Sequence, residues 1–229
     1  GAISLTIDSE TTANGFGTGN VSGNSLWNNK KGNNDVANND ITVKVGDTVV
    51  LAPIFEAQIG DAQYRFFQDA INAVQNGETI TVLRDIATNV EIKEKDNVKV
   101  TINGNGMKMT GTIKVVALSS DNDRRITIKN FKFEDTTSAS VDFITSVETN
   151  HYPRITVEGC TFTGSGDATD VALRLKSSKN VEIKNCTGKG LHSFIQNTSG
   201  WNLTIEGVTV TESKSAFALG TVQGVTIKG

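Results

Sequence analysis

The sequence is poor in cysteine, proline and methionine, with 2 of each among 229 residues, and aromatic residues make up only 6%. Two cysteines exclude a disulfide-dense small scaffold. Twenty-two glycines without a collagen period, beside many threonine, valine, isoleucine and asparagine residues, exclude a collagen-like array and a helical bundle. The composition therefore predicts a β-rich protein with enough residues for one sizeable core.

The sequence also lacks an excess of charge and a long apolar run. Lysine and arginine number 22 against 25 acidic residues, so no basic surface favours a nucleic-acid partner. The longest apolar run, 49–55, contains Pro53 and is far shorter than the roughly 20 residues of a membrane span, so we expect no membrane insertion. No initiator methionine or secretory leader is present at Gly1, so we expect a mature or trimmed chain. The threonine- and asparagine-rich composition is typical of a secreted or cell-surface bacterial protein.

Residues 1–78 read as an N-terminal cap region that forms one structural domain with residues 79–229. Residues 12–40 are rich in asparagine, glycine and serine and predict a long loop. Within that loop, Trp27 either packs the loop onto the body or offers a platform for a sugar ring. Alternating residues 41–45, a turn at 46–48 and apolar residues 49–51 predict a hairpin.

One helix is expected, over residues 65–76, because its apolar residues recur at helical spacing on one face. Asp61 is the expected N-cap, and Asn76 with Gly77 supplies a left-handed stop. A run of short strands follows without another helix. We therefore expect this helix to cap the end of a β structure.

A four-residue motif occurs six times after residue 100. Its first position is threonine or glutamate, its second is isoleucine or valine, its third is polar or charged, and its fourth is asparagine or glycine. Successive copies lie 22 to 29 residues apart, which is the length of one coil of a solenoid. The aliphatic marker residues are Ile102, Ile128, Val157, Ile183, Ile205 and Ile227.

Each copy has the pattern of a short strand that ends at a sharp corner. Apolar and polar residues alternate before the marker, and the asparagine or glycine after it tolerates a left-handed bend. Two further short strands follow before the next copy. Three strands per coil, stacked in register, predict an all-β fold, a right-handed parallel β-helix of about six to seven coils of 22–29 residues with an N-terminal cap.

These coils and corners resemble the right-handed parallel β-helix of the pectin-lyase-like superfamily. Residues 64–85 are similar to the cap helix and first strand of many bacterial surface proteins of that fold, and the resemblance covers residues 64–229. It implies the fold much more specifically than the function, because the superfamily includes lyases, hydrolases, phage spikes, adhesins and noncatalytic surface modules.

Catalytic patterns are incomplete in this sequence. The resemblance to polygalacturonase-like enzymes would require clustered aspartates, a Gly-His-Gly and an Arg-x-Lys, of which only Arg174 to Lys176 matches. The remaining candidate catalytic group is Asp142, Arg174 and His192, on or beside the third strands of successive coils. Charges on the outside of a solenoid are the competing explanation, and we favour it.

Binding candidates are few. With two histidines and no metal-ligand spacing, we expect no metal and no cofactor. Cys160 and Cys186 occupy the same repeat position, so we expect two buried thiols in contact, not necessarily bonded. Trp201 lies in an expected turn, where it either packs or stacks on a sugar ring.

The expected function is therefore a noncatalytic module for adhesion or glycan binding, with a polysaccharide or a host or cell-surface glycan as partner. The alternative is a polysaccharide lyase or glycoside hydrolase acting on an acidic polysaccharide. The last copy reaches Gly229 with no cap after it. We therefore expect that the final coil is continued or covered by another chain.

Overall fold

The computed structural model describes residues 3–7, 28–31, 34–37, 41–45, 48–51, 55–93, 99–117, 125–134, 140–145, 154–176 and 178–229. The chain divides into two compact units, Gly1–Phe55 and Glu56–Gly229. In the first unit, one sheet contains β1 (Ile3–Ile7), β4 (Ile41–Val45) and β5 (Thr48–Leu51), and β2 (Asn28–Lys31) pairs with β3 (Asn34–Ala37). The antiparallel pairing of β4 with β5 confirms the expected hairpin. Trp27 lies outside the described residues.

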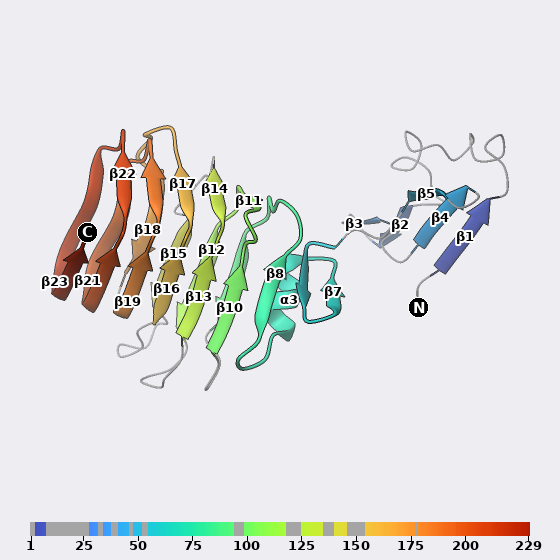
Figure 1. Cartoon of the computed structure of the whole chain (residues 1–229), viewed down its shortest axis with the longest axis horizontal. Helices are drawn as coiled ribbons and strands as arrows, with labels where there is room; N and C mark the ends of the chain where they lie inside the picture. The colour runs from blue at the N-terminus through green and yellow to red at the C-terminus, as the bar shows by residue number, and fades with distance from the viewer. Residues whose placement is uncertain are drawn as a thin grey trace. The chain divides into compact units, whose positions relative to one another are not determined.

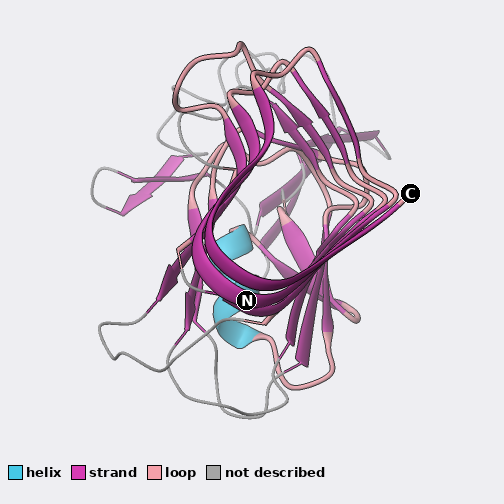
Figure 2. Cartoon of the chain, turned by 90° about the vertical axis from the view of Figure 1, so that its left-hand side faces the viewer, coloured by secondary structure: helices cyan, strands magenta, loops and turns pink. Residues whose placement is uncertain are grey.

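The second unit is a parallel β-solenoid of about 5 turns, slightly fewer than the expected six to seven (Figure 1). Each complete turn contributes one strand to each of three faces, which Figure 2 shows in end view. The first face contains β8 (Thr79–Val82), β10 (Lys99–Asn103), β13 (Arg125–Lys129), β16 (Ile155–Glu158) and β19 (Ser178–Lys184). The second contains β11 (Lys108–Met109), β14 (Lys132–Glu134), β17 (Thr161–Thr163), β20 (Thr187–Lys189) and β22 (Thr209–Thr211).

The third face contains β9 (Val90–Lys93), β12 (Ile113–Ala117), β15 (Val141–Thr145) and β18 (Val171–Leu175). The last turns differ, because β21 (Ser193–Glu206) and β23 (Ser215–Lys228) each run without a break from the third face into the first. The two long strands therefore join the first and third faces into one sheet.

The marker residues stack on one another as the repeat predicts. Parallel pairing places Ile102 beside Ile128, Val157 beside Ile183, and Ile205 beside Ile227. The intervening steps have the same register, and every marker except Ile227 is buried. The inward positions of the first face thus form a continuous aliphatic core.

Asparagine and glycine form the corners between the first and second faces. Asn130, Gly159, Asn185 and Gly207 all have φ between 51° and 60°, the left-handed conformation that these residues adopt at least cost. The first copy is different, since the left-handed residues there are Asn105 and Gly106, past Gly104.

Phenylalanine rings fill the interior behind the second face. The ring centroids of Phe131 and Phe133 are 5.3 Å apart, those of Phe133 and Phe162 are 5.0 Å apart, and Phe194 meets Phe162 edge-on at 5.5 Å. Phe67 of the cap helix lies 6.3 Å from Phe131 and extends this row into the cap.

The cap contains α3 (Phe67–Ala73), shorter than the expected helix over 65–76, together with β6 (Ala57–Ile59) and β7 (Ala62–Tyr64). The expectation that Asp61 is the N-cap is wrong: Phe66 is the N-cap and makes no side-chain cap bond. Glu56 supplies the missing acceptor instead, because its Oε2 accepts the Phe67 N–H at 2.7 Å. Antiparallel pairing of β6 with β8 covers the first-face edge at this end of the solenoid.

Candidate functional site

A row of polar side chains runs along the outside of the third face. In-register pairing aligns Glu91 of β9, Lys114 of β12, Asp142 of β15, Arg174 of β18 and Gln196 of β21. Two of the candidate catalytic residues, Asp142 and Arg174, are therefore direct neighbours. The row positions are about 4.8 Å apart, one strand spacing.

The charged members of this row form ion pairs with one another. Lys114 Nζ lies 2.8 Å from Glu91 Oε2, and Arg174 Nη1 lies 3.3 Å from Asp142 Oδ2. The other oxygen of Asp142, Oδ1, is buried and has no hydrogen-bond partner among the described residues. Because the charges alternate in sign, stacking in register places attractive rather than repulsive pairs side by side.

The ion pair keeps Glu91 ionised. The hydrogen bond from Lys114 lowers the pKa of the Glu91 carboxyl below its usual value, and this effect outweighs the opposing effect of burial. At neutral pH Glu91 is therefore a carboxylate that accepts hydrogen bonds. A general acid in glycoside hydrolysis requires the opposite shift, a raised pKa.

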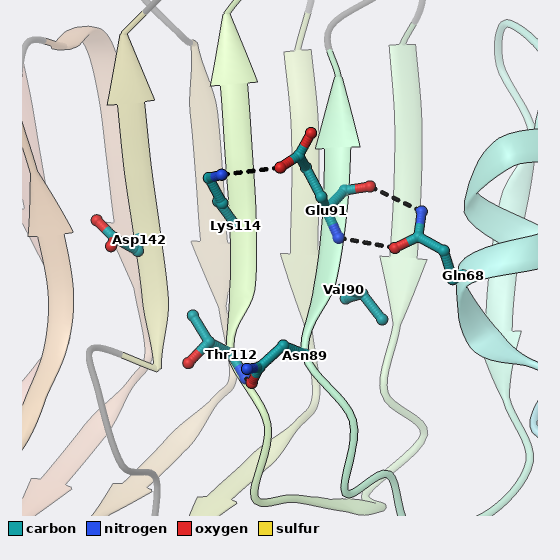
Figure 3. A pocket seen from close by; sticks show the side chains of 7 residues that line it. All are labelled: Gln68, Asn89, Val90, Glu91, Thr112, Lys114 and Asp142. Carbon is teal, nitrogen blue, oxygen red and sulfur yellow. Dashed lines mark hydrogen bonds and ion pairs between the residues drawn. The ribbon is translucent and has the colours of Figure 1, made fainter. Parts of the chain in front are cut away.

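A groove lies between the cap helix and the third face. One hollow of about 310 Å³ is lined by Gln68, Asn89, Val90, Glu91, Thr112, Lys114 and Asp142. Figure 3 shows Gln68 extending from α3 toward Glu91 of β9, with Lys114 and Asp142 on the two strands beyond it. A second hollow of about 400 Å³ shares Gln68 and Glu91 and continues along α3 to Asn72 and along β9 to Lys93. We call the two together the cap groove.

Hydrogen bonds to the backbone hold the wall of the cap groove in place. Gln68 Nε2 donates to the Glu91 carbonyl at 2.9 Å, and the Glu91 N–H donates to Gln68 Oε1 at 2.8 Å (Figure 3). The amide thus bonds to β9 as a neighbouring strand would. Asn89 Oδ1 accepts the Thr112 N–H at 2.8 Å. The groove is a built polar surface with amide, hydroxyl, ammonium and carboxylate groups.

His192 lies outside the row that contains Asp142 and Arg174, and Gln196 occupies the row position of its turn. The His192 N–H donates to the Asp170 carbonyl at 2.9 Å, and its own carbonyl accepts from Ser215 at 3.0 Å. Its Nδ1 atom is buried without a partner among the described residues. The structure therefore brings together two of the three catalytic candidates.

Asp170 is a buried charge, although the polar turn after Gly166 predicts a solvated loop for Asp167 and Asp170. It is 7% exposed, and its Oδ2 accepts the Ser165 N–H at 2.7 Å, the Ser165 hydroxyl at 2.9 Å and the Asp167 N–H at 3.0 Å. Burial favours a higher pKa for Asp170, but the bonds from Ser165 and Asp167 outweigh it and lower the pKa. Asp170 thus closes the loop of residues 164–170.

Trp201 is a second candidate for ligand contact. The expectation that Trp201 lies in a turn is wrong, because the residue lies within β21. Its side chain is 39% exposed, which is high for so large an apolar residue. Strand pairing places Lys179 on one side of it and Gln223 on the other. An exposed indole between an ammonium and an amide has both a stacking face and hydrogen-bond donors for a sugar ring.

The two cysteines are buried and free, as their shared repeat position predicts. Contact with Cys186 and burial both raise the pKa of Cys160. Among the described residues no group of three or more metal-ligating side chains gathers. No helix in the described part of the chain is long and apolar enough to cross a membrane.

These features define the chain as a parallel β-solenoid with a helical cap and a polar groove beside it. Comparisons with known proteins give no significant match to a family model, a curated protein or a solved structure.

Proposed function

We propose that this chain is a noncatalytic glycan-binding module of a secreted or cell-surface bacterial protein. The observation that carries the proposal is the cap groove, whose lining alternates amides, a hydroxyl and charged groups around Val90. Sugar hydroxyls donate and accept hydrogen bonds, so they match a surface that offers both. The volume of each hollow lies in the range of small-molecule sites.

The state of the charges supports binding rather than bond cleavage. Glu91 is held as a carboxylate by Lys114, and Arg174 is paired with Asp142. A hydrolase needs a protonated carboxyl, and a lyase needs a base that is free to accept a proton. The ion pairs occupy the groups that would perform either step.

The repeat geometry and Trp201 support a polymeric ligand. A polysaccharide has its own repeat, and the third face offers polar positions at each strand from β9 to β21. Trp201 adds a stacking surface on the part of β21 that pairs with β19 of the first face. The resemblance of the sequence to pectin-lyase-like and bacterial surface proteins favours a carbohydrate over other ligands. The same resemblance is the reason for proposing a surface location.

The test is a glycan array on the intact protein, followed by calorimetric titration of the glycans that bind. We expect Lys114→Ala to weaken binding at least tenfold. Lys189→Ala is the matched control, because Lys189 pairs with Glu212 at 3.4 Å and does not line the cap groove. Trp201→Ala is compared in the same way with Phe66→Ala, which removes another exposed aromatic ring. Equal effects of Lys114→Ala and Lys189→Ala would contradict a site in the cap groove.

The adjacent pair of Asp142 and Arg174 favours one alternative, a lyase acting on acidic polysaccharides. In that case Arg174 would separate from Asp142 and lose a guanidinium proton to solvent when a uronate binds. The neutral Arg174 would then accept the proton on the carbon next to the uronate carboxyl group, while the neighbouring glycosidic C–O bond breaks and a carbon–carbon double bond forms. The assay is formation of unsaturated product from acidic polysaccharides. Turnover that disappears in Arg174→Ala would replace the binding proposal with the lyase.

A further inference from the structure

The second hollow of the cap groove borders an edge of β9. Among the described strands, β9 pairs only with β12. The Val90 N–H points toward β12, where the Thr112 carbonyl accepts it at 2.9 Å. Because backbone groups alternate sides along a strand, the N–H and C=O of Glu91 and of Lys93 point the other way, toward α3. Both residues therefore present a backbone donor and a backbone acceptor to the groove.

A side-chain amide satisfies the first of these two positions. Gln68 donates from Nε2 to the Glu91 carbonyl at 2.9 Å and accepts the Glu91 N–H on Oε1 at 2.8 Å, as Figure 3 shows. These are the bonds that a peptide group of a neighbouring strand would make. A carboxamide therefore fits between α3 and the edge of β9 with its donor and its acceptor both used.

The second position, at Lys93, lacks such an amide among the described residues. The helix rises about 6 Å over the four residues from Gln68 to Asn72. The strand rises about 6.6 Å over the two residues from Glu91 to Lys93. Asn72 and Lys93 thus lie one step further along the same groove, and both line the second hollow. The asparagine side chain is one methylene shorter than glutamine, and Asn72 Oδ1 accepts a hydrogen bond from Gln68 Nε2 at 3.0 Å.

The chemistry of the second hollow matches an acetamido group. That group contains one N–H, one C=O and one methyl group, and it carries no charge. The Lys93 C=O and N–H offer the complementary acceptor and donor, and Ile71 lines the hollow with apolar surface for the methyl group. The charges are already balanced, since Lys93 Nζ lies 3.7 Å from Glu91 Oε1. A neutral amide therefore suits the hollow better than a uronate carboxylate or a free ammonium.

We propose that the second hollow binds the acetamido group of an N-acetylated amino sugar, whose N–H and C=O bond to the backbone of Lys93 as Gln68 bonds to Glu91. This rests on the proposed binding of a glycan in the cap groove, and it names the class of sugar that the groove selects. Neighbouring sugars of the same glycan lie along the first hollow, where their hydroxyls meet the side chains of Thr112 and Lys114.

The first test compares three oligosaccharides of equal length and linkage by calorimetric titration of the intact protein: the N-acetylglucosamine oligomer, its deacetylated form and the glucose oligomer. We expect the acetylated oligomer to bind at least tenfold more tightly than the other two. Any other N-acetylated glycan found on the array is compared with its deacetylated form in the same way. Equal affinities would overturn the selection of the acetamido group and leave glycan binding intact. Binding of no glycan would overturn both proposals.

The second test removes the backbone donor. Lys93→Pro deletes the N–H that points into the groove and keeps the ladder with β12, since proline is tolerated on an edge strand whose N–H faces away from the ladder. Lys93→Ala is the matched control, because it removes the same ammonium and keeps the N–H. We expect Lys93→Ala to retain the preference for the acetylated oligomer and Lys93→Pro to bind all three oligomers with similar affinity. Equal preferences in the two variants would refute the bond at Lys93.

The third test fills the hollow and does not depend on the folding of the proline variant. Asn72→Gln lengthens the side chain by one methylene, so that its amide can bond to Lys93 as Gln68 bonds to Glu91 and take the place of the acetamido group. We expect this variant to lose the preference for the acetylated oligomer, whereas Asn72→Ala leaves the hollow open and retains it. Urea unfolding followed by circular dichroism checks that both variants are folded. An unchanged preference in Asn72→Gln would place the acetamido group elsewhere and overturn the proposal.

Discussion

Replacing Gly190 by alanine tests the stacking of neighbouring turns. Gly190 has φ +65°, and a Cβ atom there would lie 2.5 Å from the carbonyl oxygen of Gly164 in the adjacent turn. That oxygen belongs to the backbone, so a side-chain rotation cannot relieve the clash. Gly166 is a matched control, since it has φ +85° but its Cβ would be 3.9 Å from the nearest atom.

Both substitutions place a non-glycine residue in the left-handed conformation, but only Gly190→Ala also creates a steric clash. A left-handed non-glycine residue costs about 1–2 kcal/mol, and the less flexible unfolded chain returns about half of this. The overpacked contact at Gly190 adds about 1–3 kcal/mol. We therefore expect Gly166→Ala to lower the free energy of unfolding by about 1 kcal/mol and Gly190→Ala by about 3 kcal/mol.

Urea unfolding followed by far-UV circular dichroism measures both values on the same transition. Equal midpoints for Gly190→Ala and Gly166→Ala would mean that the turns do not approach each other at Gly164. The in-register stacking of β20 on β17, from which the approach of Gly190 to Gly164 follows, would then be wrong. A larger loss of unfolding free energy in Gly190→Ala than in Gly166→Ala, with an unchanged slope against urea concentration, would support this stacking.

Two further predictions concern buried groups. Asp170→Asn should lower the stability at pH 7. Because the folded pKa of Asp170 lies below its usual value, the advantage of the wild type is present above that usual value and is lost as the pH falls through the folded pKa; urea midpoints at pH 7 and pH 2.5 measure it, and a constant difference would contradict the assignment. Cys160 and Cys186 should resist a bulky thiol reagent in the native protein and react fully in urea, so rapid native labelling would show that the stacking register is wrong.

The fold could be predicted because its signal is local and repeated. Alternation before Ile128 or Ile183 sets the inward side of a strand, and the asparagine or glycine that follows sets the corner. The number of turns was harder to predict because the end turns are incomplete. At the first turn the second face is reduced to a single bridge between Ile86 and Met109.

The cap helix shows the same limit. Helical spacing located its buried residues, but Asp61 was wrongly expected to cap it. The group that satisfies the helix N-terminus is Glu56, eleven residues before Phe67. Such a contact depends on how β6 returns along the cap, and no short motif carries that information.

The candidate site could be predicted only in part. Period-two alternation placed Asp142 and Arg174 outward, and their pairing confirms that they are neighbours. His192 lies beside the third-face part of β21, as expected, but outside the row, because the distance from marker to row varies from 12 residues at Ile102 to 17 at Val157. The longer distance after Val157 includes the loop of residues 164–170 that Asp170 closes. The repeated motif carries no information about that loop. The bonds from Gln68 to Glu91 cross 23 residues and join the cap to a strand edge.

Charges of alternating sign occupy one outward row on each of two faces, and this bears on which residues indicate function. The first face has its own row, Lys129, Glu158, Lys184, Glu206 and Lys228, with the sign reversed at each step. Stacking in register places such positions about 4.8 Å apart, where like charges would repel. The row on the third face alternates in the same way, so ion pairing between neighbouring strands is sufficient to explain its charges. Alternation is not general, because Lys108 stacks in register with Lys132 on the second face.

Groups that stacking does not require are therefore the better indicators of a ligand. The Thr112 hydroxyl at the cap groove and the exposed ring of Trp201 belong to no alternating row. Because neighbouring charges in both rows are of opposite sign, the surface offers a ligand little long-range attraction. Affinity would then come from hydrogen bonds and ring stacking at short range, and these are the contacts that a neutral, hydroxyl-rich glycan makes best.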